Sequence, residues 1–189
     1  MASQVEICNF ALSRLGAKTI TSLEDGTTEA NLCSAMFDIL AKEVMAAGSW
    51  SSTIARIELA STGSTPSFEF SYTFQLPVDP LCLKVLAVNE GAPGVIQYAI
   101  EQDKLLTDES SIKIKYVSYL TSTDDWDTLL TRAFIARLAS ELAYPITGSD
   151  SKAQVEYQRY ERFLQDGLAL DGQQGSSQVS YSTDLTEVR

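Results

Sequence analysis

The chain has 189 residues, of which 44% are hydrophobic and 21% charged, so it has enough apolar material to bury a core and is not a disordered polymer. Its formal net charge of −11 argues against a protein that grips nucleic acid or an anionic membrane, because both need clustered Lys and Arg. Cys8, Cys33 and Cys82 are scattered without a C-x-x-C spacing, which indicates free thiols in a reducing compartment. The opening residues lack the basic and apolar regions of a signal peptide, and no apolar run approaches the ~18 residues of a membrane span. We therefore expect a protein made in the cytoplasm, with no membrane partner.

A first helix is predicted directly after the N-terminus. Ser3 and Glu6 have the spacing of a capping box, in which each side chain satisfies a backbone N–H at the start of a helix. Gly16 follows as the C-cap. The apolar residues between these signals recur at helical spacing and are Val5, Cys8, Leu12 and Leu15.

A second helix is predicted from near Thr28 to about Gly48, after a turn-rich stretch. Its apolar stripe consists of Leu32, Cys33, Met36, Phe37, Leu40 and Val44. Trp50 comes directly after this helix. We interpret Trp50 as a plug at the end of the helical core, with a ligand-stacking role as the alternative.

Residues 52–120 lose the helical period. The stretch SFEFSYTFQ, residues 67–75, alternates apolar and polar side chains, which predicts a half-buried antiparallel strand. One face of that strand would carry Phe68, Phe70, Tyr72 and Phe74. The stretches LCLKVLAV and IKIKYVSYL are two more strands, and Pro77 and Pro80 belong at a corner between strands because proline cannot donate a ladder hydrogen bond. The pattern predicts a lobe of four to six antiparallel strands.

The helical period then returns. Asp127 is placed to cap a helix with Leu130, Phe134, Leu138 and Leu142 along one row and alanines beside it. Tyr144-Pro145 is expected to end or kink this helix, and Asp150 is a candidate N-cap for a last helix. From Asp171 onward the polar sequence has no stripe and predicts an extended tail.

The expected fold is therefore α+β. A four-helix body comprises residues 1–50 and 121–171, an inserted antiparallel β lobe comprises residues 51–120, and an extended C-terminal tail comprises residues 172–189. Because the helices can form one body only if the strands leave it and return to it, the lobe is an insertion that projects.

Catalytic and metal-binding patterns are weak. The chain has no histidine, which removes Ser-His and Cys-His pairs and the commonest metal ligand. Asp124, Asp125 and Asp127 lack the ligand spacing of a calcium loop and are better explained as acids at a helix start. Asp150-Ser-Lys152 is better explained as a helix cap than as a fragment of a nuclease site. The aromatic residues 68–74 lack the interleaved cations of a base-stacking platform. We expect no enzyme activity, no cofactor and no metal.

Several blocks of the chain resemble the tail tubular protein A family, the head-to-tail adaptors of short-tailed bacteriophages. The stretch ICNFALSRLGAKTITSLEDGTTEANLC is similar to the family's opening, where I-C-N-x-A-L-x-x-L-G is followed by I-x-S-L-x-D and by a second helix that ends near a Trp, here Trp50. FQLPVDPLCLKVL resembles the family's corner, although Pro80 departs from the usual pattern. IEQDKLLTD and IKIKYVSYLTSTDDWD resemble the closing strands, and FIARLASELAYPITGS resembles the penultimate helix.

The resemblance implies a structural adaptor of a bacteriophage virion. It implies a homo-oligomeric ring of twelve copies that joins the portal protein to the tail nozzle, carries tail fibres and lets genomic DNA pass through an acidic lumen. The location would be the neck of the virion, after assembly in the host cytoplasm. Inter-subunit or nozzle contact is expected at the lobe corner, residues Leu76, Pro77, Asp79 and Pro80. Portal docking is expected from the tail, residues Gln178, Val179, Ser180, Tyr181, Leu185, Val188 and Arg189.

Two other functions stay open. A tail-associated enzyme that degrades the cell wall would need a pair of carboxylates, with Glu101, Asp103 and the acids near Asp124 as candidates. A generic protein-binding module would need only an exposed surface.

Overall fold

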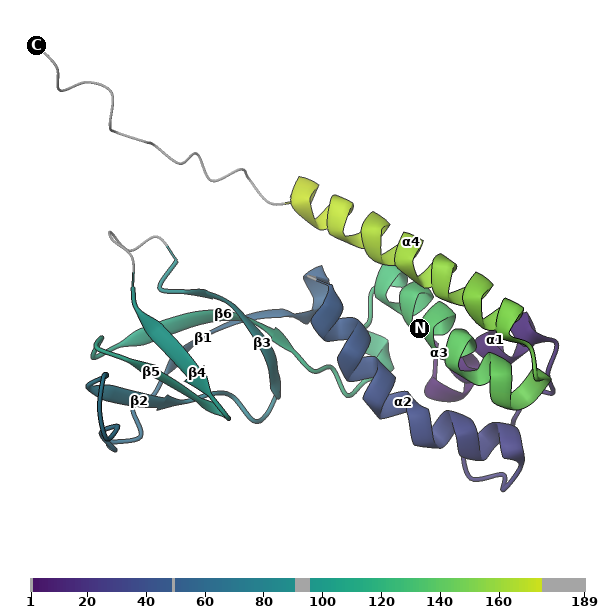
Figure 1. Ribbon diagram of the computed structural model, residues 1–189, viewed down its shortest axis with the longest axis horizontal. Helices are drawn as coiled ribbons and strands as arrows, with labels where there is room; N and C mark the ends of the chain where they lie inside the picture. Colours follow the sequence, from purple (N-terminus) through teal and green to yellow (C-terminus); the bar gives the residue numbers. More distant parts are fainter. Residues whose placement is uncertain (1, 49, 91–95, 175–189) are drawn as a thin grey trace, which may run out of the picture.

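The computed structural model describes residues 2–48, 50–90 and 96–174, and the molecule is elongated, with helices at one end and strands at the other (Figure 1). Within these residues the order of elements is two helices, six strands and two helices, which confirms the predicted α+β fold with β structure inserted between helices. Two short 3-10 turns, η1 (Ser51–Thr53) and η2 (Thr123–Asp125), lie where the chain enters and leaves the strands.

The first two helices form as their end signals predict. Helix α1 (Gln4–Leu15) begins at a capping box between Ser3 and Glu6 and ends at Gly16, whose φ of 74° is the left-handed conformation that glycine adopts without strain. Helix α2 (Thr28–Ala47) begins at Thr27, which accepts a hydrogen bond from the amide of Ala30. The local sequence alone therefore determines where these helices start and stop.

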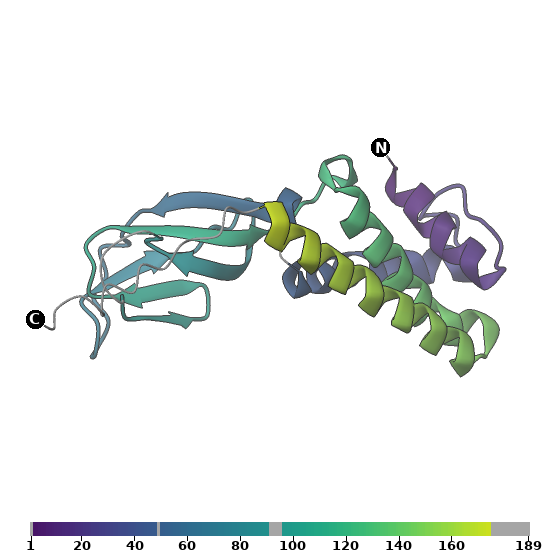
Figure 2. The ribbon, with the colours of Figure 1, turned by 90° about the horizontal axis from the view of Figure 1, so that it is seen from above.

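Helix α3 (Thr128–Thr147) is the centre of the helical body, and it contacts α1, α2 and α4 (Figure 2). Because it has partners on several sides, its buried residues cover most of its circumference. They include Leu130, Ala133, Phe134, Ala136, Leu138, Ala139, Leu142 and Ala143. The predicted apolar row and the alanines beside it are thus confirmed as core. Asp127 caps the helix as predicted, accepting from the amide of Leu130 at 2.8 Å.

Three helix boundaries differ from the prediction. Helix α3 continues through Pro145 to Thr147, because the amide of Gly148 and the hydroxyl of Thr147 donate to carbonyls of the last turn. Helix α4 (Asp150–Gln174) is capped by Ser149 rather than Asp150, since the Ser149 hydroxyl accepts from the amide of Lys152 at 3.4 Å. The same helix runs three residues into the stretch predicted as tail, where glutamines tolerate a helix well.

The β lobe consists of two three-stranded antiparallel sheets among the residues described. One has the order β1-β6-β3, from β1 (Ile54–Leu59), β6 (Ile112–Ser118) and β3 (Cys82–Val88). The other has the order β2-β5-β4, from β2 (Tyr72–Gln75), β5 (Lys104–Thr107) and β4 (Tyr98–Glu101). Residues on the facing sides of the two sheets form a second hydrophobic cluster, separate from the core of the helices: Leu59, Phe74, Leu76, Leu105, Ile112, Ile114 and Tyr116.

The strand predicted over residues 67–75 is wrong in its first half. Only Tyr72–Gln75 pairs with another strand, and Glu69 has a φ of 71°, which interrupts an extended backbone. Phe68 is 79% exposed, whereas Phe74 is 1% exposed. The predicted row of four buried aromatic residues is therefore reduced to Phe74.

The lobe is joined to the body by packed side chains as well as by the chain itself. Leu83 and Leu86 of β3 pack against the core of the helices, and Val117 of β6 belongs to that core. Tyr119 donates its hydroxyl hydrogen bond to Asp38 of α2 at 3.2 Å, and the ammonium of Lys42 lies 5.1 Å from the centre of its ring. These contacts fix the direction in which the lobe projects from the body.

Two further sequence expectations concern cysteines and membranes. Cys8 and Cys33 are buried in the body, where a hydrogen bond with Cys33 and burial raise the pKa of the Cys8 thiol, and Cys82 is partly buried. Across the described ranges, no helix has the length and hydrophobicity needed to span a bilayer.

Candidate interaction surfaces

The corner between β2 and β3 is the first surface predicted from the sequence. Pro77 and Pro80 lie between strands as expected, and a bridge joins Val78 to Leu81 across the corner. Val78 is 68% exposed, and Asp79 and Pro80 are exposed beside it. An apolar tip of this kind is available to a partner.

Leu76 does not belong to that tip. Its side chain is 7% exposed and packs in the hydrophobic cluster of the lobe. Leu76 was predicted as a contact residue of the corner, but it packs in the same cluster as Phe74 of β2. The exposed apolar residues of the corner are instead Val78 and Leu81, which the prediction did not include.

The second predicted surface is the tail, which lies outside the described residues. It comprises Gln178, Val179, Ser180, Tyr181, Leu185, Val188 and Arg189. The helix that precedes it, α4, ends on the side of the helical body from which the β lobe projects (Figures 1 and 2).

A basic hollow of about 660 Å³ lies on the sheet β1-β6-β3, and the sequence analysis did not anticipate it. Along β6, Ile112, Ile114 and Tyr116 point into the lobe, so the alternate residues Lys113 and Lys115 point to the opposite face. The strand register then places Arg56 of β1 directly opposite Lys115.

The charges of this basic hollow are only partly compensated. Lys113 forms a long ion pair with Glu58 at 3.9 Å, and both side chains are largely exposed. No ion pair within the described part of the chain reaches Arg56 or Lys115. Like charges directly opposite each other on neighbouring strands destabilise a sheet. The pair Arg56–Lys115 is therefore by itself unfavourable for the pairing of β1 with β6.

Asn89 gives the basic hollow a fixed wall. It has a φ of 43°, a conformation that is uncommon for residues other than glycine. Its backbone N–H donates to the carbonyl of Lys113 at 2.7 Å, and its side-chain oxygen accepts from the amide of Lys113 at 2.6 Å. This reciprocal pair holds the end of β3 against β6, so the hollow is preformed.

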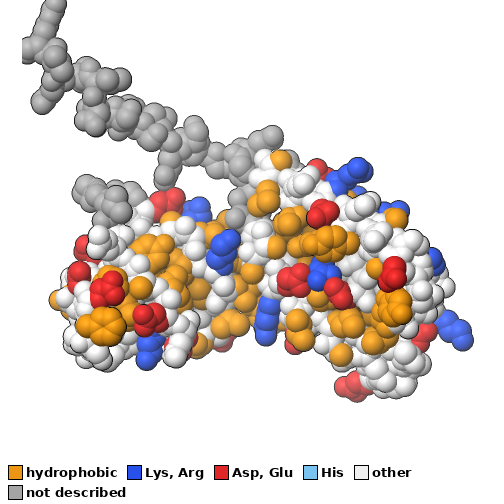
Figure 3. Space-filling model, in the orientation of Figure 1, with side chains coloured by type: hydrophobic (Ala, Val, Ile, Leu, Met, Phe, Trp, Pro, Cys, Tyr) orange, Lys and Arg blue, Asp and Glu red, His pale blue; other side chains and the backbone are white. Residues whose placement is uncertain are grey.

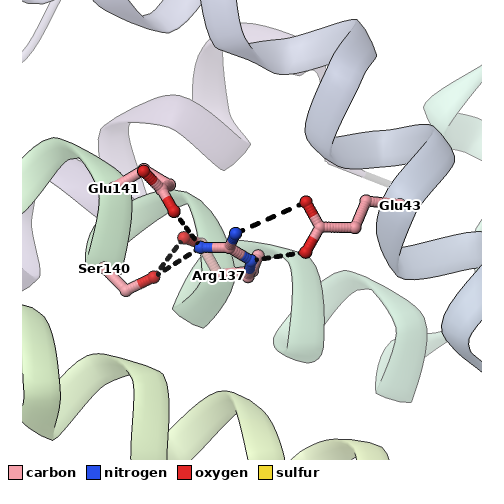
Figure 4. Close-up of polar contacts among 4 residues, drawn as sticks. All are labelled: Glu43, Arg137, Ser140 and Glu141. Atoms are coloured by element: carbon pink, nitrogen blue, oxygen red, sulfur yellow. Dashed lines mark hydrogen bonds and ion pairs between the residues drawn. The ribbon is translucent and has the colours of Figure 1, made fainter.

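A second charged group lies on the helical body, centred on Arg137 of α3 (Figure 4). Its guanidinium donates to Glu43 of α2 at 2.9 and 3.4 Å, to Ser140 at 3.2 Å, and to Glu141. Burial opposes the charged form of Arg137, but the hydrogen bonds to Glu43 and Glu141 outweigh it and raise its pKa. The cation is thus permanent and ties α2 to α3.

Beside Arg137 lies a groove of about 510 Å³ between α3 and α4, which we call the tyrosine groove. It is lined by Arg137, Ser140, Glu141, Tyr144, Ala153, Gln154, Tyr157, Gln158 and Glu161. Tyr144 is 60% exposed and Tyr157 44% exposed. The Arg137 guanidinium lies 5.6 Å from the centre of the Tyr157 ring, which holds that ring in place. Figure 3 shows acidic and basic side chains adjacent to one another among exposed hydrophobic side chains on this face of the helices.

The tyrosine groove has an excess of negative charge. Arg137 is matched by Glu43 and Glu141, and Glu161 adds a further exposed carboxylate. Tyrosine rings beside carboxylates are a setting that favours a cationic side chain from a partner. Tyr and Arg are also the residue types enriched where interfaces concentrate binding energy.

The carboxylates considered for an enzyme lie in two places, at the hairpin between β4 and β5 and in the residues that precede α3. Glu101 lies at the end of β4 and Asp103 follows in the turn to β5, where a hydrogen bond from Gln75 at 2.9 Å lowers the pKa of Asp103. Asp124 and Asp125 lie in η2, next to the body. Asp127 is engaged by the amide of Leu130 and the hydroxyl of Ser52.

Lys152 is likewise engaged, because its ammonium donates to the carbonyl of Leu15 at the end of α1. In the part of the chain that the structure describes, no cluster of three or more Cys, Asp or Glu side chains is arranged to hold a metal ion.

The sequence contained a partial signal for the basic hollow. The alternation IKIKY already places Lys113 and Lys115 on the face opposite two isoleucines. It did not identify Arg56 as their neighbour, because register between distant strands is a tertiary property. Compared with models of protein families and with curated proteins, the chain matches no family model and none of those proteins.

Proposed function

We propose that this chain is a structural head-to-tail adaptor of a bacteriophage virion. In this proposal its copies form a ring that joins the portal protein to the tail nozzle, carries tail fibres and lines the channel through which genomic DNA passes. The ordered blocks of similarity to tail tubular proteins suggest the role, and the ring of twelve copies comes from that resemblance.

The observation that carries the proposal is an elongated, internally braced molecule with distinct exposed surfaces on its two parts. The lobe has its own hydrophobic cluster and is fixed to α2 through Leu83, Leu86 and Tyr119. A connector has to hold two partners in a fixed relative position. A lobe that is packed against the body can do so because it does not rotate freely. Exposed apolar residues at the lobe corner and aromatic residues on the body give such partners places to bind.

The charge of the chain supports the same proposal. A net charge of −11 keeps separate copies soluble and repels the phosphate backbone of a passing duplex. A wall that repelled DNA would let the genome slide, whereas a basic wall would retain it.

Electron microscopy of purified portal rings mixed with the full chain tests this function. We expect a second ring on one face of the portal and co-sedimentation of the two proteins. Portal rings that stay bare at high concentrations of the chain would contradict the proposal.

The tail provides a separate test. Deletion of residues 176–189 should abolish binding to the portal while the far-ultraviolet circular dichroism and the unfolding midpoint stay unchanged, because this deletion starts after α4 ends at Gln174. A truncated chain that binds the portal as well as the full chain would remove the tail from the interface without affecting the rest of the proposal.

A further inference from the structure

We propose that the basic hollow on the lobe of one copy binds the tyrosine groove on the body of the next copy. This inference rests on the proposed function in taking the partner to be a second copy of the chain. It goes further by naming the two surfaces that join.

The two surfaces are complementary in charge, in a chain that otherwise repels itself. A net charge of −11 opposes the approach of two copies, and contact between opposite charges reduces that repulsion. Arg56, Lys113 and Lys115 are three of only 14 basic residues, and they gather on one face of one sheet. Glu58 and Glu90 at the same hollow make it a poor track for a continuous phosphate backbone, which favours a partner with separate carboxylates.

The repulsion between Arg56 and Lys115 favours the same kind of partner. These side chains lie directly opposite each other across the ladder between β1 and β6, and neither forms an ion pair within the described part of the chain. A carboxylate from a second copy, placed between Arg56 and Lys115, would reduce their repulsion and attract both cations. Because Asn89 already fixes the backbone of the hollow, the ordering required on binding is confined to its side chains.

The tyrosine groove has the negative charge that complements the basic hollow. The tyrosine groove offers the exposed carboxylates Glu141 and Glu161 beside the rings of Tyr144 and Tyr157. A guanidinium or ammonium from the basic hollow can pair with these carboxylates and lie on the rings.

The placement of the two surfaces makes the contact directional. The hollow belongs to the lobe and the groove to the body, and the packing of β3 and β6 on α2 prevents the lobe from folding onto its own groove. Joining one surface to the other therefore uses different patches on the two copies, and when two copies do not close the contact reciprocally it propagates into a ring or a filament. A ring requires contacts of this type.

Carbodiimide cross-linking, which joins lysine amines to carboxylates in contact, tests the contact. An equal mixture of ¹⁵N-labelled and unlabelled full chain is treated at low salt, both free and on portal rings. We expect cross-links between Lys113 or Lys115 of one copy and Glu141 or Glu161 of the other, recognised by their mixed isotopic mass. The absence of mixed-label cross-links at these residues in both settings would overturn the inference.

A charge exchange provides the matched test. R56E/K115E should lower the yield of the mixed-label cross-link from Lys113 by about tenfold or more, and adding E161K should restore much of it. K104E reverses one charge at an exposed position of β5 outside the hollow, against two in R56E/K115E, and should change the yield by less than about twofold. A loss of cross-link with K104E equal to that with R56E/K115E, or no recovery with E161K, would contradict the pairing.

These outcomes are separable from the fate of the proposed function. If rings form on the portal but no cross-link joins the hollow to the groove, the adaptor role stands and the inference fails. If portal rings stay bare while the free chain still gives the cross-link, the contact stands and the adaptor role fails.

Discussion

Substitution of Gly167 by alanine should destabilise the protein, although helix propensity alone predicts the opposite. Gly167 lies inside α4, where glycine costs about 0.8–1 kcal/mol relative to alanine. A Cβ at this position would overlap Cζ3 of Trp50 and lie 2.9 Å from its Cη2. Trp50 is 4% exposed, and its indole N–H donates to the carbonyl of Val44 at 2.8 Å, so the ring cannot move aside easily.

The size of the effect follows from these two opposing contributions. Overpacking of a tightly packed core costs about 1–3 kcal/mol. After the propensity gain is subtracted, we expect G167A to lower the free energy of unfolding by up to about 2 kcal/mol. In a Trp50→Leu background the ring is gone, so the same substitution should be neutral or stabilise by up to about 1 kcal/mol. The change of sign between backgrounds is the diagnostic result.

Urea unfolding followed by far-ultraviolet circular dichroism measures all four proteins of this double-mutant cycle. Q165A, at an exposed position of the same helix, is the control and should change the free energy of unfolding by less than about 0.5 kcal/mol. If G167A stabilised the protein that contains Trp50, the interpretation of Trp50 as the plug between α2 and α4 would be refuted.

Three further predictions concern buried groups. G48A should also lower the unfolding midpoint, because the added Cβ would lie 2.5 Å from Trp50 Cε2. The φ of −107° at this position suits alanine, so the backbone adds no strain, and an unchanged midpoint would contradict the prediction. E156Q should cost about 1–3 kcal/mol in urea unfolding, since Glu156 is buried and accepts from both Arg14 and Arg159, whereas E161Q at an exposed site should cost almost nothing. Burial, with Asp38 nearby, raises the pKa of Tyr119 to about 12, whereas the pKa of tyrosine in the unfolded chain is about 10. The neutral phenol of Tyr119 should therefore contribute fully to stability below about pH 10, and this contribution should disappear as the pH rises through about 12. Y119F should lose less stability over that range, and parallel curves for the two proteins would contradict the assignment.

The parts of the fold that were predictable are those set by neighbouring residues. Ser3, Glu6 and Gly16 bound α1 through contacts within one turn, and Asp127 caps α3 in the same way. Capping geometry is local, so a short sequence is enough to determine it. The presence of strands between the second and third helices was also predictable, because the two-residue period of a strand differs from the period of about 3.6 residues in a helix.

The parts that were not predictable depend on distant partners. Residues 67–71 alternate as well as Tyr72–Gln75 does, yet β5 is only four residues long and pairs with the second group alone. Leu76 and Val78 are similar apolar residues two positions apart, and only the second sheet decides that one is buried and the other exposed. Arg56 and Lys115 are separated by the whole lobe in sequence, so their adjacency had no local signal.

The difference between these two groups of residues bears on how such a chain would assemble. Core residues of β6, such as Ile114, belong to the hydrophobic cluster of the lobe, whereas Lys113 and Lys115 on the opposite face do not. Residues that fold the lobe and residues available to a partner thus alternate along a single strand. Reversal of the lysines should leave the lobe folded, because no core contact is lost, whereas replacement of Ile114 should unfold it. The proposed contact can therefore be tested separately from stability at neighbouring residues, and this separation makes the charge-exchange experiment interpretable.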